Sequence, residues 1–150
     1  MSPAPRGPRA RRVEKRPQRA RSPRPPLPDD VFLKRQRDMI LETRGRRTGR
    51  PHRAQLWFVH QAGHLFLMAY ARRHGRGTDW YQNLRRAGGG RMEAGDRRYE
   101  VEWEVIRDPS AELARITELF SGKYGRQMVA SYYLESRRFP VILRVRPAGT

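Results

Sequence analysis

The sequence contains no cysteine. The absence of thiols excludes disulfide bonds, thiolate zinc sites, cysteine-ligated iron–sulfur clusters and a cysteine nucleophile. It is compatible with a reducing compartment, and we expect a cytoplasmic protein. The four histidines, His52, His60, His64 and His74, lack the spacing of a metal-ligand pair on one helical face, so we expect no metal site.

The chain also lacks an apolar segment suited to a membrane span. Residues 54–71 contain no Asp, Glu, Lys or Arg, but several polar residues interrupt the run and HQAGH has the composition of a turn. The first residues have no apolar core of a secretory signal. The sequence therefore favours a soluble protein.

Acidic residues are scarce, because 15 Asp and Glu face 33 Lys and Arg, which gives a net charge of +18. Nearly all of the basic residues are arginine, since lysine occurs only at Lys15, Lys34 and Lys123. A charge of this sign and size indicates an anionic partner, such as nucleic acid, an anionic membrane surface or a phosphorylated small molecule.

Residues 1–28 hold nine basic residues against Glu14 alone, a net charge of +8, together with eight prolines. With almost no large apolar residue, this segment is predicted to be a disordered tail. Residues 29–150 are predicted to form one domain, which carries the remaining +10. The tail is either a solvated extension or a contact to nucleic acid or to the inner face of the membrane.

Hydrophobic alternation and turn residues predict about six strands and three or four short helices. Helices are expected from about residue 30 and at 78–87, 108–120 and 126–136. Strands are expected at 39–45, 53–60, 64–71, 91–97, 98–106 and 140–146. Successive strands form hairpins without a strand–helix–strand rhythm. This order predicts an α+β protein, mainly β, whose antiparallel sheet curls into a small barrel with peripheral helices.

Two stretches combine residue types that bind anions or rings. In RGRRTGRPH, residues 44–52, two glycines allow backbone amides to approach an anion and the arginines can fork onto phosphate oxygens. In TDWYQNLRR, residues 78–86, Trp80 and Asn83 offer a ring and an amide near a helix start, where negative charge is favoured. The alternatives are a charged turn and a helix whose Trp80 packs in the core.

Read in order, RGRRTGRPHRAQLWFV, GHLFLMAYA, TDWYQNL and FPVILRVRP resemble the deazaflavin-dependent nitroreductase family over about residues 39–147. The resemblance implies a split β-barrel related to pyridoxamine-phosphate oxidases. It implies coenzyme F420, a deazaflavin with a phosphate and a polyglutamate tail, as cofactor, with FMN as the alternative. It also implies a reductase, and suggests a homodimer, that transfers a hydride from reduced deazaflavin to a quinone or nitroaromatic.

The resemblance further assigns cofactor-binding residues to three segments. They are Arg46, Arg47, Thr48, His52, Arg53 and Ala54; Met68, Ala69, Tyr70, Ala71 and Arg72; and Asp79, Trp80, Tyr81, Gln82 and Asn83. Candidates for the wall of the acceptor pocket are Tyr70, Tyr124, Tyr132 and Tyr133, with core packing as the alternative, and no catalytic residue is identified. The chain departs from the family at Tyr70, where a small residue is common, and at Arg72 and Arg73, where glycines are common.

Two other functions stay open: a nucleic-acid-binding protein that acts through its charge, and a family member that binds cofactor without turnover. The first differs from the reductase in where its arginines lie. If Arg46 and Arg47 point into a cleft beside Trp80, a cofactor is favoured. If they form a convex strip continuous with the tail, nucleic acid is favoured.

Overall fold

The computed structural model describes residues 30–133 and 136–146, so the predicted tail lies outside the described residues. In this part of the chain seven strands form one antiparallel sheet in the order β2-β1-β5-β6-β7-β4-β3. The strands are β1 (Asp38–Arg44), β2 (Pro51–Trp57), β3 (Val59–Gln61), β4 (His64–Tyr70), β5 (Gly89–Ala94), β6 (Arg97–Trp103) and β7 (Arg138–Arg146).

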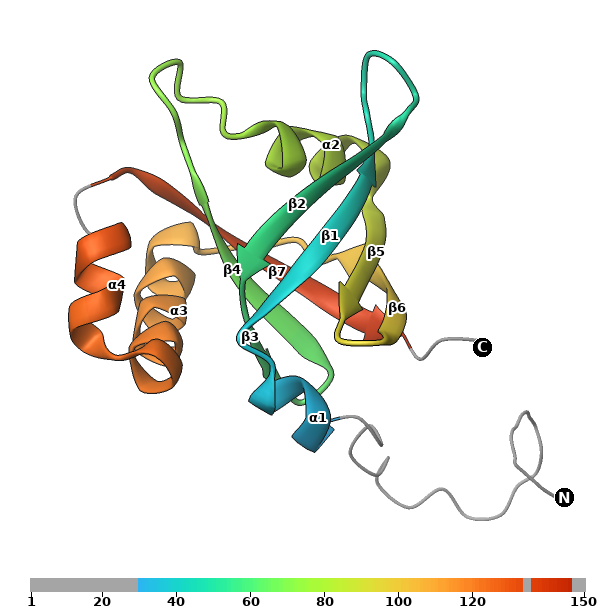
Figure 1. Cartoon of the computed structure of the whole chain (residues 1–150). Helices are drawn as coiled ribbons and strands as arrows, with labels where there is room; N and C mark the ends of the chain where they lie inside the picture. Colours follow the sequence, from blue (N-terminus) through green and yellow to red (C-terminus); the bar gives the residue numbers. More distant parts are fainter. Residues whose placement is uncertain (1–29, 134–135, 147–150) are drawn as a thin grey trace, which may run out of the picture.

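The helices of the described residues are α1 (Asp30–Arg35), α2 (Asp79–Ala87), α3 (Pro109–Tyr124) and α4 (Arg126–Tyr132). The sheet curls, α2 lies across one end of it, and α3 and α4 lie beside β4 and β7 (Figure 1). The predicted mainly β class and the curled antiparallel sheet with peripheral helices are therefore confirmed.

The curled sheet has two hydrophobic clusters, one on each face. Along β4, Leu65, Leu67 and Ala69 belong to the cluster inside the curl, which Leu84 of α2 joins. The intervening Phe66 and Met68 belong to the cluster under α3 and α4. This separation follows from the alternation of side chains along a strand, and it decides on which side of the sheet each candidate residue lies.

The predicted hairpin around the sequence QAG forms, but its first strand is shorter than expected. Ala62 and Gly63 both have positive φ, 52° and 79°, as a two-residue hairpin turn requires. The expected strand 53–60 is broken at Phe58, whose backbone N–H donates to Tyr124 Oη at 3.0 Å and whose carbonyl accepts from Lys123 Nζ at 2.9 Å. Because α3 binds this backbone, β2 pairs with β1 whereas β3 pairs with β4.

The solvent-facing side of β1, β5, β6 and β7 carries alternating glutamates and arginines in ion pairs. Arg53 bridges Glu42 and Glu93 at 2.9 and 3.0 Å, and Arg91 pairs with Glu100 at 3.1 Å. Glu102 and Glu104 both pair with Arg144. Most glutamates of the sheet thus form ion pairs with arginines of the same or a neighbouring strand.

No helix in the described residues is long and apolar enough to cross a membrane.

Replacing Tyr124 with Phe is expected to destabilise the fold. The hydroxyl accepts from Phe58 N and donates to a carbonyl oxygen, that of Arg37 at 2.6 Å or of Phe58 at 2.8 Å. Its removal leaves a buried N–H without an acceptor, at a cost of about 1–3 kcal/mol in the free energy of unfolding. Urea unfolding of Tyr124→Phe measures this cost, with Tyr132→Phe as the matched control because Tyr132 is 55% exposed. Equal stability of the two variants would contradict this role.

Candidate functional site

Arg46 fastens the β1–β2 turn to α2. Its backbone N–H and its Nη1 both donate to Asn83 Oδ1, at 3.1 and 2.8 Å. Its Nη2 lies 3.2 Å from Asp79 Oδ1. Asn83 is buried, and its Nδ2 reaches Thr43 Oγ1 at 3.4 Å. The Arg46–Asn83 bonds therefore join the two stretches that the sequence singles out.

The β1–β2 turn is closed by its own hydrogen bonds. Gly45 N donates to Arg50 O at 2.7 Å, and Gly49 N donates to Gly45 O at 2.8 Å. Thr48 Oγ1 accepts from Arg50 N at 3.1 Å. These hydrogen bonds fix the backbone that carries the arginines of the turn. The Thr48 hydroxyl oxygen already accepts one of them.

The β4–α2 loop requires glycine at Gly77. Its φ is 97°, and a Cβ there would lie 2.5 Å from the ring of Tyr81. Gln82 Nε2 donates to the Gly77 carbonyl at 2.8 Å, which ties the start of α2 to the loop. Arg72 has a φ of 62°, the left-handed region that suits the glycine of the resembled family and that costs a larger residue about 1–2 kcal/mol.

A hollow of about 510 Å³ lies between the β4–α2 loop, α2 and β7. We call it the basic hollow. The rings of Tyr81 and Phe139 stack at its wall with centroids 4.9 Å apart. Its volume is in the range of ligand pockets. None of its lining residues is a carboxylate, and four are arginines: it is lined by Arg46, Gly75, Arg76, Tyr81, Gln82, Arg85, Arg86 and Phe139.

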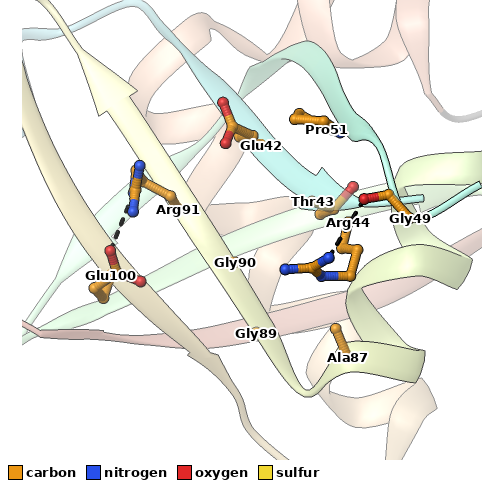
Figure 2. Close-up of a pocket in the computed structure, with 10 residues that line it drawn as sticks. All are labelled: Glu42, Thr43, Arg44, Gly49, Pro51, Ala87, Gly89, Gly90, Arg91 and Glu100. Atoms are coloured by element: carbon orange, nitrogen blue, oxygen red, sulfur yellow. Dashed lines mark hydrogen bonds and ion pairs between the residues drawn. The ribbon is translucent and has the colours of Figure 1, made fainter. Parts of the chain in front are cut away.

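A second hollow of about 480 Å³, which we call the glycine hollow, is lined by residues of β1, the β1–β2 turn, β5 and the end of α2 (Figure 2). The bare backbone of Gly89 and Gly90 forms part of its lining. Arg44 donates to the Gly49 carbonyl at 3.4 Å across this hollow. Its other lining residues include Glu42, Thr43, Pro51, Ala87, Arg91 and Glu100.

The turn, the loop and α2 meet at the same end of the sheet (Figure 1) and share a strong positive charge. Asp79 is the sole carboxylate of segments 44–50 and 71–87, and it is bonded to Arg46. All of the arginines there except Arg46 are exposed. This set, the arginine surface, comprises Arg44, Arg46, Arg47, Arg50, Arg72, Arg73, Arg76, Arg85 and Arg86.

The structure brings part of the predicted cofactor set together and separates the rest. Arg46, Asp79 and Asn83 form one hydrogen-bonded group, and Tyr81 and Gln82 line the basic hollow beside Arg46. Trp80 is 7% exposed and packs in the inner cluster, in agreement with the core alternative. Arg47 is exposed on the turn, next to Thr48.

The predicted residues of β2 and β4 point to different faces. Arg53 is bound to Glu42 and Glu93 on the solvent side, and these hydrogen bonds, Glu93 first, raise the pKa of its guanidinium. Ala54 packs against the inner cluster. His52 is half-buried, and its Nδ1 has no hydrogen-bond partner within the described residues.

At the end of β4 the predicted segment also alternates. Ala69 lies inside the curl, while Met68 and Tyr70 lie under α3 and α4. Ala71 is buried and begins the loop, and its N–H donates to Arg137 O at 2.9 Å.

The four candidate tyrosines lie in one aromatic cluster with Trp57, on the α3–α4 side of the sheet. Trp57 stacks on Tyr124 at 4.3 Å between centroids, and Tyr70 stacks on Tyr133 at 5.5 Å. Burial raises the pKa of Tyr124 to about 12, and its hydroxyl is engaged by Phe58. The Tyr70 hydroxyl donates to Tyr132 O at 2.6 Å. Tyr132 remains the most exposed ring of the cluster.

Sequence reasoning missed five residues of the basic hollow: Gly75, Arg76, Arg85, Arg86 and Phe139. A signal existed for two of them, because Arg85 and Arg86 follow Gln82 by three and four residues and thus share its helical face. Phe139 comes from β7, and its position depends on pairing with a residue of β4, Ala69.

The curled antiparallel sheet defines the class of protein, the split β-barrel. Its solved relatives include a conserved hypothetical protein of Mycobacterium tuberculosis, 23% identical, with a TM-score of 0.59 and 78% of each chain covered. An F420 reductase is 20% identical, with a TM-score of 0.58, and 81% of this chain and 95% of that chain are covered. An FAD-binding protein of Mesorhizobium loti is 9% identical, with a TM-score of 0.56, and 79% and 88% are covered.

The chain belongs to the family described as uncharacterized protein conserved in bacteria (DUF2255), whose model matches residues 32–145. No curated protein matches the chain. The family model carries no function, so the resemblance of the motifs to the deazaflavin-dependent nitroreductases is supported by the fold alone. The fold shared with the solved relatives confirms the structural part of that resemblance, and the choice of cofactor stays a prediction.

Replacing Asn83 with Ala is expected to release the β1–β2 turn. The Arg46 backbone N–H then has no acceptor, at a cost of about 1–3 kcal/mol. Amide hydrogen exchange measures the effect, and we expect the Arg46 amide to exchange roughly ten- to a hundredfold faster. The control is Gln55→Ala, because Gln55 is exposed and its side-chain amide donates to the half-buried strand-end residue Asp38, away from the β1–β2 turn. Unchanged exchange in Asn83→Ala would show that the turn holds without this hydrogen bond.

Proposed function

We propose that this chain is a reductase that binds a phosphorylated flavin-type cofactor, coenzyme F420, with its anionic part in the basic hollow. The observation that carries the proposal is a ligand-sized hollow with four arginines and no lining carboxylate, built by the turn and the helix that the sequence singles out. Two solved proteins of similar fold, an F420 reductase and an FAD-binding protein, support a cofactor of this class. FMN is the alternative cofactor.

The residues present suit a phosphate or carboxylate group. Arg76, Arg85 and Arg86 offer guanidinium forks, which bind such oxygens through two parallel hydrogen bonds. Arg46 serves mainly to fix the wall, because two of its nitrogens already donate to Asn83 and Asp79. No carboxylate lines the hollow, so its arginines have no counterion from a lining side chain.

Other groups at this end suit a planar ring. The half-buried ring of Phe139, backed by the buried ring of Tyr81 on which it stacks, offers an aromatic surface. Within the described residues, β2 pairs with β1 alone and β3 pairs with β4 over His64–Phe66, so in this part of the chain β2 and the end of β4 each have an unpaired edge. His52 adds an uncommitted ring nitrogen on β2. These edges and this nitrogen are available to the polar atoms of a ring.

A reduced deazaflavin, when bound, supplies the hydride. The chain itself needs to bind the cofactor, orient its ring and exclude water from the site. We assign the acceptor, a quinone or nitroaromatic, to the part of the aromatic cluster at the end of β4, where Tyr70 directly precedes the loop that lines the basic hollow. Tyr70 and Tyr124 are engaged by backbone carbonyls and build the wall. Tyr132 is exposed, and its hydroxyl is the group we assign to hydrogen-bond the acceptor oxygen.

Fluorescence titration of F420, with FMN in parallel, tests the proposal. We expect F420 to bind and Arg76→Gln/Arg86→Gln to bind it at least tenfold more weakly, because removing a charged hydrogen bond costs about 1.5–3 kcal/mol. The matched control is Arg107→Gln/Arg126→Gln, which removes the same charge from arginines outside the hollow. No binding of either cofactor, or equal binding by both variants, would refute the proposed site.

A further inference from the structure

The two hollows adjoin each other along the end of α2. Arg85 and Arg86 line the basic hollow, and the next residue, Ala87, lines the glycine hollow. The β1–β2 turn and the strand end before it contribute to both, with Arg46 lining the basic hollow and Arg44 and Gly49 lining the glycine hollow. Two depressions of about 480 and 510 Å³ therefore border the arginine surface, and the two glutamates that line the glycine hollow, Glu42 and Glu100, are each paired with an arginine. This arrangement suits consecutive units of a linear polyanion better than one small ion.

An arginine-rich composition alone does not explain this surface, because the carboxylates are unevenly distributed. On the solvent side of the sheet, Glu42, Glu93, Glu100, Glu102 and Glu104 each pair with an arginine. On the arginine surface the single carboxylate, that of Asp79, pairs with Arg46. No other arginine of that surface has an ion pair within residues 30–133 and 136–146. The uncompensated charge of the described domain is therefore concentrated at this end.

The surface suits nucleic acid better than a membrane. Binding to a bilayer combines basic residues with apolar side chains that enter the lipid. Among the described residues, the exposed large hydrophobic side chains are those of Val31, Val105, Met128 and Tyr132, and none belongs to the arginine surface. Arginine forks without apolar neighbours match a phosphate backbone.

The hollows favour a single strand over a duplex. A single strand presents unstacked bases together with its phosphates, and aromatic surfaces bind such bases by stacking. The basic hollow offers the half-buried ring of Phe139, backed by the buried ring of Tyr81, and the glycine hollow is lined by the backbone of Gly89 and Gly90 (Figure 2). A duplex keeps its bases stacked inside and leaves both hollows unfilled.

We propose that the arginine surface binds single-stranded nucleic acid, with phosphates on its arginines and bases in the two hollows. This activity goes beyond the proposed reductase, although Arg76, Arg85 and Arg86 belong to both sites. It needs neither cofactor nor turnover.

Fluorescence anisotropy of a labelled single-stranded oligonucleotide of mixed sequence, titrated with the full chain at several salt concentrations, tests the proposal. We expect binding that weakens with salt. Arg44→Gln/Arg85→Gln is expected to weaken it several-fold and to lower the slope of log affinity against log salt by about 0.7 for each phosphate that an arginine no longer neutralises. The control, Arg107→Gln/Arg126→Gln, carries the same net charge and is expected to bind as the unchanged chain does.

Three results would overturn the proposal. Equal weakening by the two double variants would mean that net charge alone acts. Tighter binding of a duplex of the same sequence would exclude the role of the hollows. Binding to phosphatidylserine vesicles without binding to the oligonucleotide would assign the surface to lipid.

One further variant separates this proposal from the reductase. Arg44 lines the glycine hollow and is absent from the basic hollow. Arg44→Gln alone is therefore expected to weaken oligonucleotide binding while the F420 titration stays unchanged. If the chain does not bind F420 but binds the oligonucleotide more weakly in Arg44→Gln, the reductase fails and the nucleic-acid surface stands. If the chain binds F420 and Arg44→Gln binds the oligonucleotide as tightly as the unchanged chain does, the nucleic-acid surface is rejected and the reductase stands.

Discussion

The hydrogen bonds from Arg46 to Asn83 are the interaction on which the site depends. They join a turn between two strands to a helix 37 residues further along the chain. The acceptor amide is buried and also reaches Thr43 of β1, so it is held on two sides. Without these bonds the turn and α2 would be separate surface features. With them, the turn and the helix form the common wall of two hollows.

Charge distribution is the second constraint. On the solvent side of the sheet the glutamates form ion pairs with arginines, at distances of about 3 to 4 Å. Eight arginines without an ion pair within the described residues gather at the end where α2 lies, and there the loops contain glycines that let backbone and rings approach closely. The fold thus separates a neutralised face from a face that attracts anions. That separation is the physical basis of both proposed binding activities.

Local sequence patterns predicted most of the fold, because alternation, caps and turn residues act over a few residues. The Asp108 cap of α3 and the turn at Ala62–Gly63 are examples. The break at Phe58 could not be predicted, since it depends on Tyr124, 66 residues away. It is the reason why β2 and β3 are separate strands.

The parts of the candidate site that lie within one helix or loop could be predicted from the sequence. The parts that come together only through the pairing of distant strands could not. The stretch 79–83 was predicted as a unit, and the structure brings Arg46 to its residues Asp79 and Asn83. Arg53 alternates away from the inward side of β2, and its partners Glu42 and Glu93 come from two other strands. Phe139 reaches the hollow only because β7 pairs with β4.

The central claim is that the basic hollow binds an anionic cofactor through its arginines. The most direct measurement is the NMR spectrum of the arginine side-chain Nε–H groups during addition of F420. The account predicts that the signals of Arg76, Arg85 and Arg86 shift and saturate together, while those of Arg107 and Arg126 stay unchanged. Shifts confined to arginines outside the hollow, or no shift at all, would contradict it.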